Sequence, residues 1–355
     1  MTIRICICVF AVWSISGRAA AQTTLNPDVS VVGDIRVFSH DDEDRPLERN
    51  RVNFADPGLE MVIGGYLNPY ARADVVIAWE EGNNAEIEEA YATFLRGLPL
   101  GVNLRVGQYL LEFGRLNPTH PHAYSFLHRP LPHEVYFGLE GLRDMAVRAS
   151  LLLPTGGFHS EAMFGVLKGD LLMGEEADLG DTSAADVAPV DFGLFARVDA
   201  SVATSEYGEL AFGASGLTAI YDADEGLRAW LGGLDAKYKW KPSRNRSLQI
   251  ESEILVSRRE LITGADVTSL GAYGYGDYRF RQRFNLGAVG EYAEDVFDSD
   301  RHTWRVGGFL GFAPVEETSL VRLEGDWTKP NSGDGFWSLN LQLVFGLGPH
   351  QPHMF

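Results

Sequence analysis

Histidines are the residues whose type and spacing most directly suggest chemistry in this chain. Six of the nine histidines form two groups, one within 14 residues and one near the last residue: His120, His122, His128, His133, His350 and His353. Neutral imidazoles beside a carboxylate can bind Zn²⁺, Ni²⁺ or Cu²⁺. The spacing matches no compact zinc motif, so the alternative is a rigid, proline-rich loop whose histidines are hydrogen-bonded. Zn²⁺ is therefore a candidate ligand, and no other cofactor is indicated.

Motifs of catalysis are missing from the sequence. It contains no Gly-x-Ser-x-Gly, no His-Glu-x-x-His and no phosphate-binding glycine loop. Both cysteines, Cys6 and Cys8, lie within the first 21 residues. We therefore assign no catalytic residue and expect the protein not to be an enzyme.

Alternation of apolar and polar residues recurs along most of the chain and predicts β-strands. In 229–240, for example, Trp230 and Leu234 alternate with Asp235 and Lys237. Sixteen runs are counted: 29–38, 58–67, 70–79, 86–96, 102–109, 139–153, 158–167, 190–202, 209–219, 229–240, 247–258, 269–280, 284–292, 302–312, 318–328 and 335–346. No stretch shows convincing helical spacing. Strands of about 10 residues suit a tilted crossing of a bilayer, and an even number lets an up-and-down barrel close.

The connections between these runs alternate between short and long. Short turns are expected at 67–69, 97–101, 154–157, 241–243 and 313–315, and longer polar links at 39–56, 110–138, 168–188, 220–228, 259–268 and 293–301. A soluble β-sandwich would show the same alternation within its strands. Short turns at one end and long loops at the other are typical of transmembrane barrels. We therefore predict an all-β, antiparallel, transmembrane barrel of about 16 strands.

The N-terminal end has the pattern of a secretory signal peptide. Arg4 is followed by the apolar run 5–15 and by the small residues 19–21. The apolar run is too short for a transmembrane helix, which needs about 20 residues. We expect residues 1–21 to be removed.

The C-terminal end combines an amphipathic strand with a tail rich in proline and histidine. We expect the barrel to occupy 22–346 and the tail 347–355. A last strand that ends in an aromatic residue resembles the assembly signal of outer-membrane barrels. Either Phe345 or the terminal Phe355 could fill that role.

If the apolar face of the strands meets lipid, the other face lines the lumen. The expected pore-lining residues are of both charges: Arg36, Glu60, Arg72, Asp74, Glu89, Arg105, Asp144, Arg148, Asp235, Lys237, Glu251, Glu253, Asp277, Arg279, Arg322 and Glu324. Four charged residues of the link 110–138 are expected to constrict the pore: Glu112, Arg115, Arg129 and Glu134. Acids outnumber bases on this wall and the formal net charge is −19. We therefore expect cations to be favoured and nucleic acid not to bind.

Several short sequences resemble those of the phosphate-selective type of porin. They are Glu89-Ala90-Tyr91-Ala92-Thr93-Phe94, Leu104-Arg105-Val106-Gly107-Gln108-Tyr109, Phe113-Gly114 and the stretch from Gly138 to Arg143. The His-Pro-His loop and Gly-Pro-His tail are also similar to a group of outer-membrane barrels described as zinc-regulated or receptor-like. The resemblance implies a 16-stranded pore with a loop near 110–138 inserted into the lumen. It does not imply phosphate as the solute, because this loop is not rich in lysine.

Three functions are compatible with such a barrel in the bacterial outer membrane. The first is a porin-like channel for passive diffusion of small polar solutes or ions. The alternatives are a barrel that binds and takes up a transition metal such as zinc, and a structural barrel without an open pore. An outer-membrane phospholipase or protease is disfavoured by the missing motifs, and a TonB-dependent transporter by its 22 strands. The expected partners are outer-membrane lipid, the barrel assembly machinery, the solutes themselves and two further copies in a homotrimer.

Overall fold

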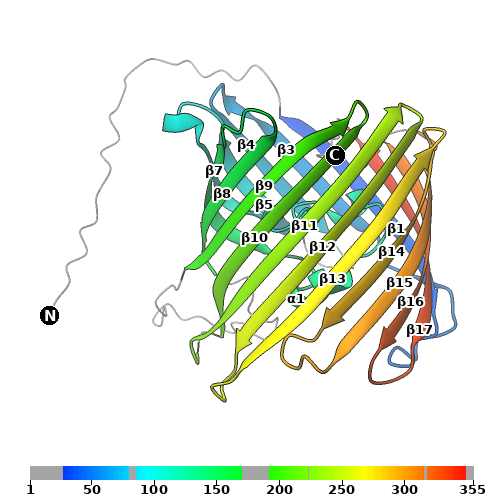
Figure 1. Cartoon of the computed structure of the whole chain (residues 1–355). Helices are drawn as coiled ribbons and strands as arrows, with labels where there is room; N and C mark the ends of the chain where they lie inside the picture. Colours follow the sequence, from blue (N-terminus) through cyan, green and yellow to red (C-terminus); the bar gives the residue numbers. More distant parts are fainter. Residues whose placement is uncertain (1–26, 80–84, 170–191, 223, 316–317, 349–355) are drawn as a thin grey trace.

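Hydrogen bonds between neighbouring strands run around a closed antiparallel barrel in the computed structural model, which describes residues 27–79, 85–169, 192–222, 224–315 and 318–348 (Figure 1). The ring has 16 strands: β1 (Asp28–His40), β3 (Gly58–Asn68), β4 (Ala71–Trp79), β5 (Glu86–Phe94), β6 (Asn103–Leu110), β7 (Arg143–Leu152), β8 (His159–Leu167), β9 (Gly193–Ser205), β10 (Gly208–Asp222), β11 (Leu227–Ser243), β12 (Arg246–Glu260), β13 (Asp266–Phe280), β14 (Phe284–Glu294), β15 (His302–Phe312), β16 (Ser319–Pro330) and β17 (Phe336–Leu347). A short extra strand, β2 (Asn53–Phe54), pairs with β1 beside the ring. The predicted fold class and strand number are confirmed.

The barrel closes where the first strand meets the last. One edge of β1 pairs with β17 and the other with β3, so no strand edge of the ring stays open. At this seam Gly33 lies opposite Phe345. A Cβ at Gly33 would lie 2.2 Å from Phe345 Cζ, so the aromatic ring covers a position that only glycine can occupy. Phe345 thus packs at the closure itself, whereas Phe355 lies outside the described residues.

Large apolar side chains cover the outer face of the barrel. Leu234, Trp304 and Phe164 are 63%, 54% and 53% exposed, and similar residues recur on alternate positions of most strands. Soluble proteins rarely expose a contiguous apolar patch larger than roughly a few hundred Å². A belt of this kind is what lipid tails cover, so the strands span a membrane.

Two of the predicted long links are short. β10 continues to Asp222 and β11 begins at Leu227, and only residues 261–265 separate β12 from β13. The predicted links 220–228 and 259–268 were therefore wrong. Backbone hydrogen bonds between two strands form in water as well as in the bilayer. A hairpin can therefore continue into water beyond the point where the alternation of apolar residues ends.

The described residues contain one α-helix, α1 (Leu131–Phe137), and the 3₁₀ turns η1 (Pro99–Gly101) and η2 (Pro121–Ala123). The sequence shows no convincing helical spacing at α1, because seven residues are too few to show a helical period. No helix in the described part of the chain is long and apolar enough to cross a membrane.

Residues 111–142, here called the inserted segment, connect β6 to β7 through the interior of the barrel (Figure 1). The segment contains η2 and α1, and it packs against the inner wall in two apolar clusters. The first cluster contains Leu111, Phe113, Tyr136, Phe137 and Leu142 of the segment with Phe195, Leu217, Leu231 and Leu255 of the wall. The second contains Leu116, Tyr124 and Phe126 with Tyr273, Tyr275, Val289 and Phe309. The predicted inserted loop is thus confirmed, and its apolar side chains pack tightly against the inner wall of the barrel.

Candidate functional site

The inserted segment and the wall residues that hold it form the candidate site. Polar contacts to the segment come from β3 and β5 to β7 on one side of the ring, and from β10 to β16 on the other. The segment therefore bridges the lumen. Many charged wall residues predicted to line a pore bind this segment instead of facing open water.

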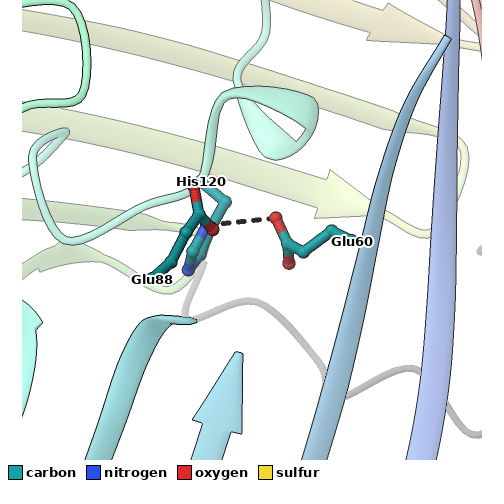
Figure 2. A group of neighbouring side chains, drawn as sticks. All are labelled: Glu60, Glu88 and His120. Atoms are coloured by element: carbon teal, nitrogen blue, oxygen red, sulfur yellow. Dashed lines mark ion pairs between the residues drawn. The ribbon is translucent and has the colours of Figure 1, made fainter. Parts of the chain in front are cut away.

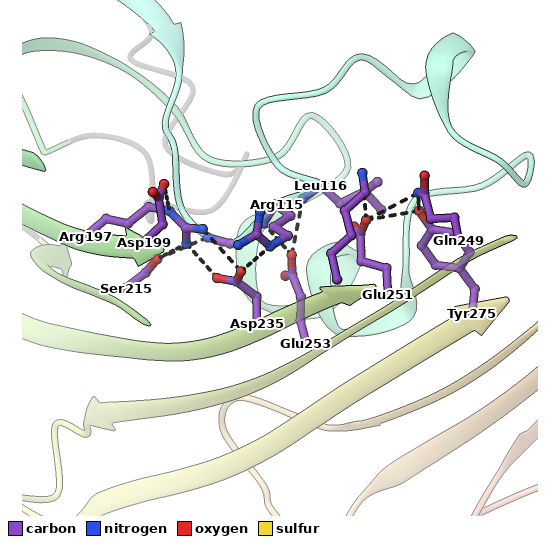
Figure 3. A network of polar contacts seen from close by, with 12 residues as sticks. Arg115, Leu116, Arg197, Asp199, Ser215, Asp235, Gln249, Glu251, Glu253 and Tyr275 are labelled. Carbon is purple, nitrogen blue, oxygen red and sulfur yellow. Dashed lines mark hydrogen bonds and ion pairs between the residues drawn. The ribbon is translucent and has the colours of Figure 1, made fainter. Parts of the chain in front are cut away.

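Arg115 attaches the start of the segment to β11 and β12 (Figure 3). Its Nε lies 2.6 Å from Asp235 Oδ1, and Arg197 of β9 donates to the other oxygen of Asp235 over 2.6 Å. The backbone amides of Arg115 and Leu116 donate to Glu253 Oε1 over 2.5 and 3.2 Å. Charge-assisted hydrogen bonds of this kind are the strong ones in a protein.

The space beside Arg115 is filled by Glu253. A Cβ at Gly114, whose φ is +66°, would lie 2.5 Å from Glu253 Oε2, so the chain passes the carboxylate at a distance that only glycine permits. The same oxygen, Oε2, lies 2.9 Å from His133 Nε2 of α1, and both side chains are fully buried. Glu253 therefore joins two distant parts of the segment.

His128 attaches the middle of the segment to β14 and β16. Its Nδ1 lies 2.5 Å from Glu324 Oε1 and its Nε2 lies 2.8 Å from Glu291 Oε1. Burial and Arg305 lower the pKa of His128, but the hydrogen bonds to both glutamates outweigh them and raise it to about 9. His128 is thus protonated at neutral pH and stabilises two buried carboxylates.

The same two glutamates also accept backbone amides. Leu127 N donates to Glu324 over 2.8 Å, and Leu131 N donates to Glu291 over 2.7 Å. The guanidinium of Arg322 donates to the carbonyls of Phe126 and Tyr124 over 3.0 and 2.5 Å. Backbone groups that have no strand partner are therefore satisfied by the wall.

Two arginines of the wall hold Glu112, the first acid of the segment. Arg105 on β6 and Arg148 on β7 lie 2.9 and 2.8 Å from Glu112 Oε1. The guanidinium of Arg105 also lies 4.6 Å from the ring centre of Tyr91. A cation over an aromatic face gains further stabilisation when water is excluded.

A second histidine group lies where η2 meets β3 and β5 (Figure 2). His120 Nδ1 lies 3.1 Å from Glu60 Oε2 and 3.6 Å from Glu88 Oε2, while His122 Nδ1 lies 3.4 Å from the same oxygen of Glu60. The two imidazoles are stacked with their centres 5.9 Å apart. Burial lowers the pKa of His120, but the nearby Glu60 and Glu89 raise it well above its ordinary value.

Not every predicted wall residue touches the segment. Arg36 pairs with Asp34 on β1 at 2.6 Å, and Arg72 pairs with Asp74 on β4 at 2.8 Å. Towards the short-turn end, Lys237 lies 3.3 Å from Glu251, and Arg279 is exposed. Asp144 accepts the amide of Gly169 over 2.8 Å.

The remaining predicted residues fall into three groups. Glu134 pairs with Arg305, and Arg129 donates to the backbone of 139–140. Asp277 accepts a hydrogen bond from Ser125 over 3.0 Å, and Glu89 accepts the amide of Leu110 over 2.9 Å. His350, His353, the predicted signal peptide and most of the tail lie outside the described residues.

Sequence reasoning missed Glu88 because it relied on uninterrupted alternation. That pattern points Glu89 inward and Glu88 outward. The register between β4 and β5 shifts between Val76 and Ile77, since Val76 pairs with Glu89 and Ile77 with Ile87. A β-bulge of this kind redirects a side chain. The run of closely spaced acids at 86–89 was the only signal in the sequence.

Comparison with known proteins agrees with the fold. No family model matches the chain. An uncharacterized protein of Aquifex aeolicus (strain VF5) is 29% identical over 276 residues, which are 72% of this chain and 53% of that protein. The chain therefore spans about half the length of this curated relative.

Solved outer-membrane barrels share the architecture at low sequence identity. An anion-selective porin from Comamonas acidovorans has a TM-score of 0.62 at 10% identity, covering 91% of this chain and 100% of that chain. The outer membrane channel DcaP of Acinetobacter baumannii has a TM-score of 0.59 at 11% identity, covering 91% and 96%. A loop L8 deletion mutant of OmpT, an outer membrane protein of Vibrio cholerae, has a TM-score of 0.60 at 8% identity, covering 91% and 99%.

The shared feature is the fold. The chain folds as a closed 16-stranded antiparallel barrel similar to those of the outer-membrane porins above, with a packed segment inside the lumen. Likeness to the phosphate-selective or zinc-regulated types in particular stays a prediction.

Proposed function

We propose that the protein is an outer-membrane channel through which small polar solutes or ions diffuse beside the inserted segment. The observation that supports this most is the inner wall between the two groups of strands that hold the segment. There, β1 carries Asp34 and Arg36, whose guanidinium side chain is 38% exposed. Nearby, between β3 and β5, β4 carries the pair Arg72 and Asp74. Paired charges with access to water make a polar path along a wall that lipid never reaches.

We further propose that this path favours cations. The chain carries 49 acidic and 30 basic residues, and several wall bases are neutralised by the segment or by neighbouring acids. A net negative wall attracts cations and repels anions near it.

Conductance of the refolded barrel in a planar bilayer tests both proposals. We expect the conductance to rise in discrete steps. Across a KCl gradient, the reversal potential should have the sign of the K⁺ equilibrium potential. A reversal potential set by Cl⁻ would refute cation preference and leave the channel intact. A folded barrel that inserts without conducting would favour the structural barrel instead.

Two variants, Asp34→Asn and its control Asp266→Asn, test whether the acids along the path cause the cation preference. Asp34 faces the proposed path, whereas Asp266 pairs with Arg258 on an exposed loop end. Loss of the charge at Asp34 should lower the permeability ratio for cations, and loss at Asp266 should not. The variant Asp34→Asn also leaves Arg36 without its Asp34 partner, which should lower the cation permeability ratio further.

The other expectations on location and partners follow from this proposal. The barrel would insert into outer-membrane lipid through the barrel assembly machinery. Because one of the similar solved structures is described as a trimer form of OmpT, we propose a homotrimer, which native mass measurement in detergent would test. No hydrolytic activity is expected.

Among the residues that the structure describes, uptake of zinc is a second candidate at the His120 group. His128 and His133 already share hydrogen bonds of 2.8 and 2.9 Å with glutamates, which leaves them poorly placed to take up an ion. Growth of a deletion strain at limiting zinc separates uptake from general diffusion, because a general channel is not needed for that growth.

A further inference from the structure

We propose that Glu60, Glu88 and His120 form a binding site for a divalent transition-metal ion such as Zn²⁺, and that the bound ion fastens the inserted segment to β3 and β5 (Figure 2). The inference goes beyond the channel proposal, because it holds equally for a barrel that does not conduct. It depends on where three side chains from three separate elements come together.

The distances in this group suit ligands of one metal ion. One ligand atom from each of Glu60, Glu88 and His120 lies within 4.8 Å of the others. Zinc bonds of about 2.0 to 2.1 Å in a tetrahedron separate neighbouring ligand atoms by about 3.3 to 3.4 Å. His120 Nδ1 lies 3.1 Å from Glu60 and 3.6 Å from Glu88, on either side of that value.

The fourth position of such a site is open to water or to a second imidazole. His122 Nδ1 lies 3.4 Å from the same Glu60 oxygen that approaches His120. Three protein ligands with one further position are a common arrangement for zinc. Imidazole nitrogen favours Zn²⁺ and its neighbours over Mg²⁺ or Ca²⁺, which prefer oxygen ligands alone.

The other nitrogen of His120 faces a further carboxylate. Its Nε2 lies 3.9 Å from Glu89 Oε1, and that oxygen is held in place by the amide of Leu110 over 2.9 Å. Histidines that bind a metal with one nitrogen usually offer the other N–H to a carboxylate or carbonyl, which orients the ring. A small rotation of Glu89 would complete that contact.

A second cluster in the described residues, made of His128, Glu324 and Asp326, is less suited to a metal ion. His128 groups with Glu324 and Asp326, but its Nδ1 lies only 2.5 Å from Glu324. This separation is shorter than the roughly 3.3 Å between neighbouring ligand atoms of one zinc ion, so the contact is an ion pair of the protonated histidine. Its other nitrogen is bonded to Glu291, which also binds Arg305, and a nearby guanidinium would repel a metal ion.

Charge also distinguishes the proposed site. When the metal ion displaces the proton of His120, the two carboxylates and the neutral imidazole together carry two negative charges, which one divalent ion balances. The side chains of His120, Glu60 and Glu88 are 15%, 14% and 21% exposed, so an ion can enter and then be partly screened from water. Because β3, β5 and the segment each supply a ligand, binding would oppose movement of the segment away from the wall.

Calorimetry on the refolded full-length barrel, first stripped with EDTA, tests the site. We expect one Zn²⁺ ion to bind per chain, with Mg²⁺ unable to compete. Glu60→Gln and His120→Gln should each weaken this binding at least tenfold, whereas His159→Gln, at an exposed histidine of β8, should leave it unchanged. Zn²⁺ binding that survives both substitutions, or no binding to the wild-type barrel, would refute the site.

The visible absorption spectrum of Co²⁺ added to the wild-type barrel tests the site without any substitution. Coordination by three or four ligands in a tetrahedron predicts visible bands that Zn²⁺ abolishes, and a spectrum identical to that of free Co²⁺ would contradict the inference. Conductance in EDTA separates this test from the channel proposal. A barrel that conducts but binds no metal refutes the site alone, and one that binds metal without conducting refutes the channel alone.

Discussion

Raising the pH should release the middle of the inserted segment from the barrel wall. The group concerned is His128, which faces Glu291 of β14, Arg305 of β15, and Glu324 and Asp326 of β16. Burial and Arg305 disfavour its protonated form, and the two glutamates favour it strongly enough to raise its pKa from 6.5 to about 9. A released His128 in water would return to the ordinary value.

The sign of the effect follows from the higher pKa in the attached state. Protonation of His128 favours attachment fully below about pH 6.5, and this stabilisation is lost as the pH rises through about 9. A difference of that size corresponds to about 3 kcal/mol at about 1.4 kcal/mol per pKa unit. The equilibrium between attached and released segment should therefore shift by roughly 300-fold across this range.

Hydrogen exchange of two amides reports the release directly. Leu127 and Leu131 donate to Glu324 and Glu291, the same glutamates that hold His128. With EDTA present and intrinsic exchange corrected for pH, their protection should fall between pH 7 and pH 10. Conductance of the channel should rise over the same interval if the released segment widens the path.

Two variants decide whether His128 is the cause. His128→Gln cannot be protonated, so its amides should be poorly protected at every pH and should lose the pH dependence. His159→Gln, on the exposed part of β8, should behave as the wild type does. Protection that is flat from pH 7 to pH 10 in the wild type, or an unchanged pH profile in His128→Gln, would refute the reasoning.

Two further pairs of substitutions probe the attachment of the segment by urea unfolding. Asp235→Asn removes a buried carboxylate shared by Arg197 and the half-buried Arg115, and should cost about 3 kcal/mol. Asp266→Asn, in an exposed ion pair, should cost less than about 1 kcal/mol. Equal midpoints would contradict this. Gly141→Ala should destabilise more than Gly138→Ala: both have φ near +80°, but only at Gly141 would a Cβ meet a side chain, 2.5 Å from Arg129 Nη1. A larger loss at Gly138 would show that steric contact is not the cause.

The strands could be predicted because lipid and water impose opposite demands on the two faces of each one. In β11, Trp230 and Leu234 face outward and Asp235 and Lys237 face inward, as the alternation of 229–240 indicates. The same signal fades where the hairpins leave the bilayer, so the lengths of β10 to β13 were underestimated. Pairing of the backbone, which any side chain permits, decides the length there.

The interior of the barrel was harder to predict. Alternation suggested a polar lumen, yet Leu255 and Tyr273 face inward and pack against the segment. An apolar side chain in a strand does not reveal whether it contacts lipid or packs in a protein core, because both environments favour apolar side chains. The histidines at 128 and 133 match the alternative of hydrogen-bonded residues in a rigid loop, and only contact distances separate them from His120.

His120 and His128 attach the segment to the wall on the two sides of the strands β17 and β1. His120 meets β3 and β5, His128 meets β14 and β16, and β17 and β1 lie between these strands in the ring. One attachment needs a proton, and the other is proposed to need a metal ion. Loss of either alone leaves the segment tethered by the other and by the apolar clusters, so it would loosen at one edge instead of leaving the lumen. The proposed path along β1 would then widen from the side whose cation is lost, which makes proton and metal separate controls on one passage.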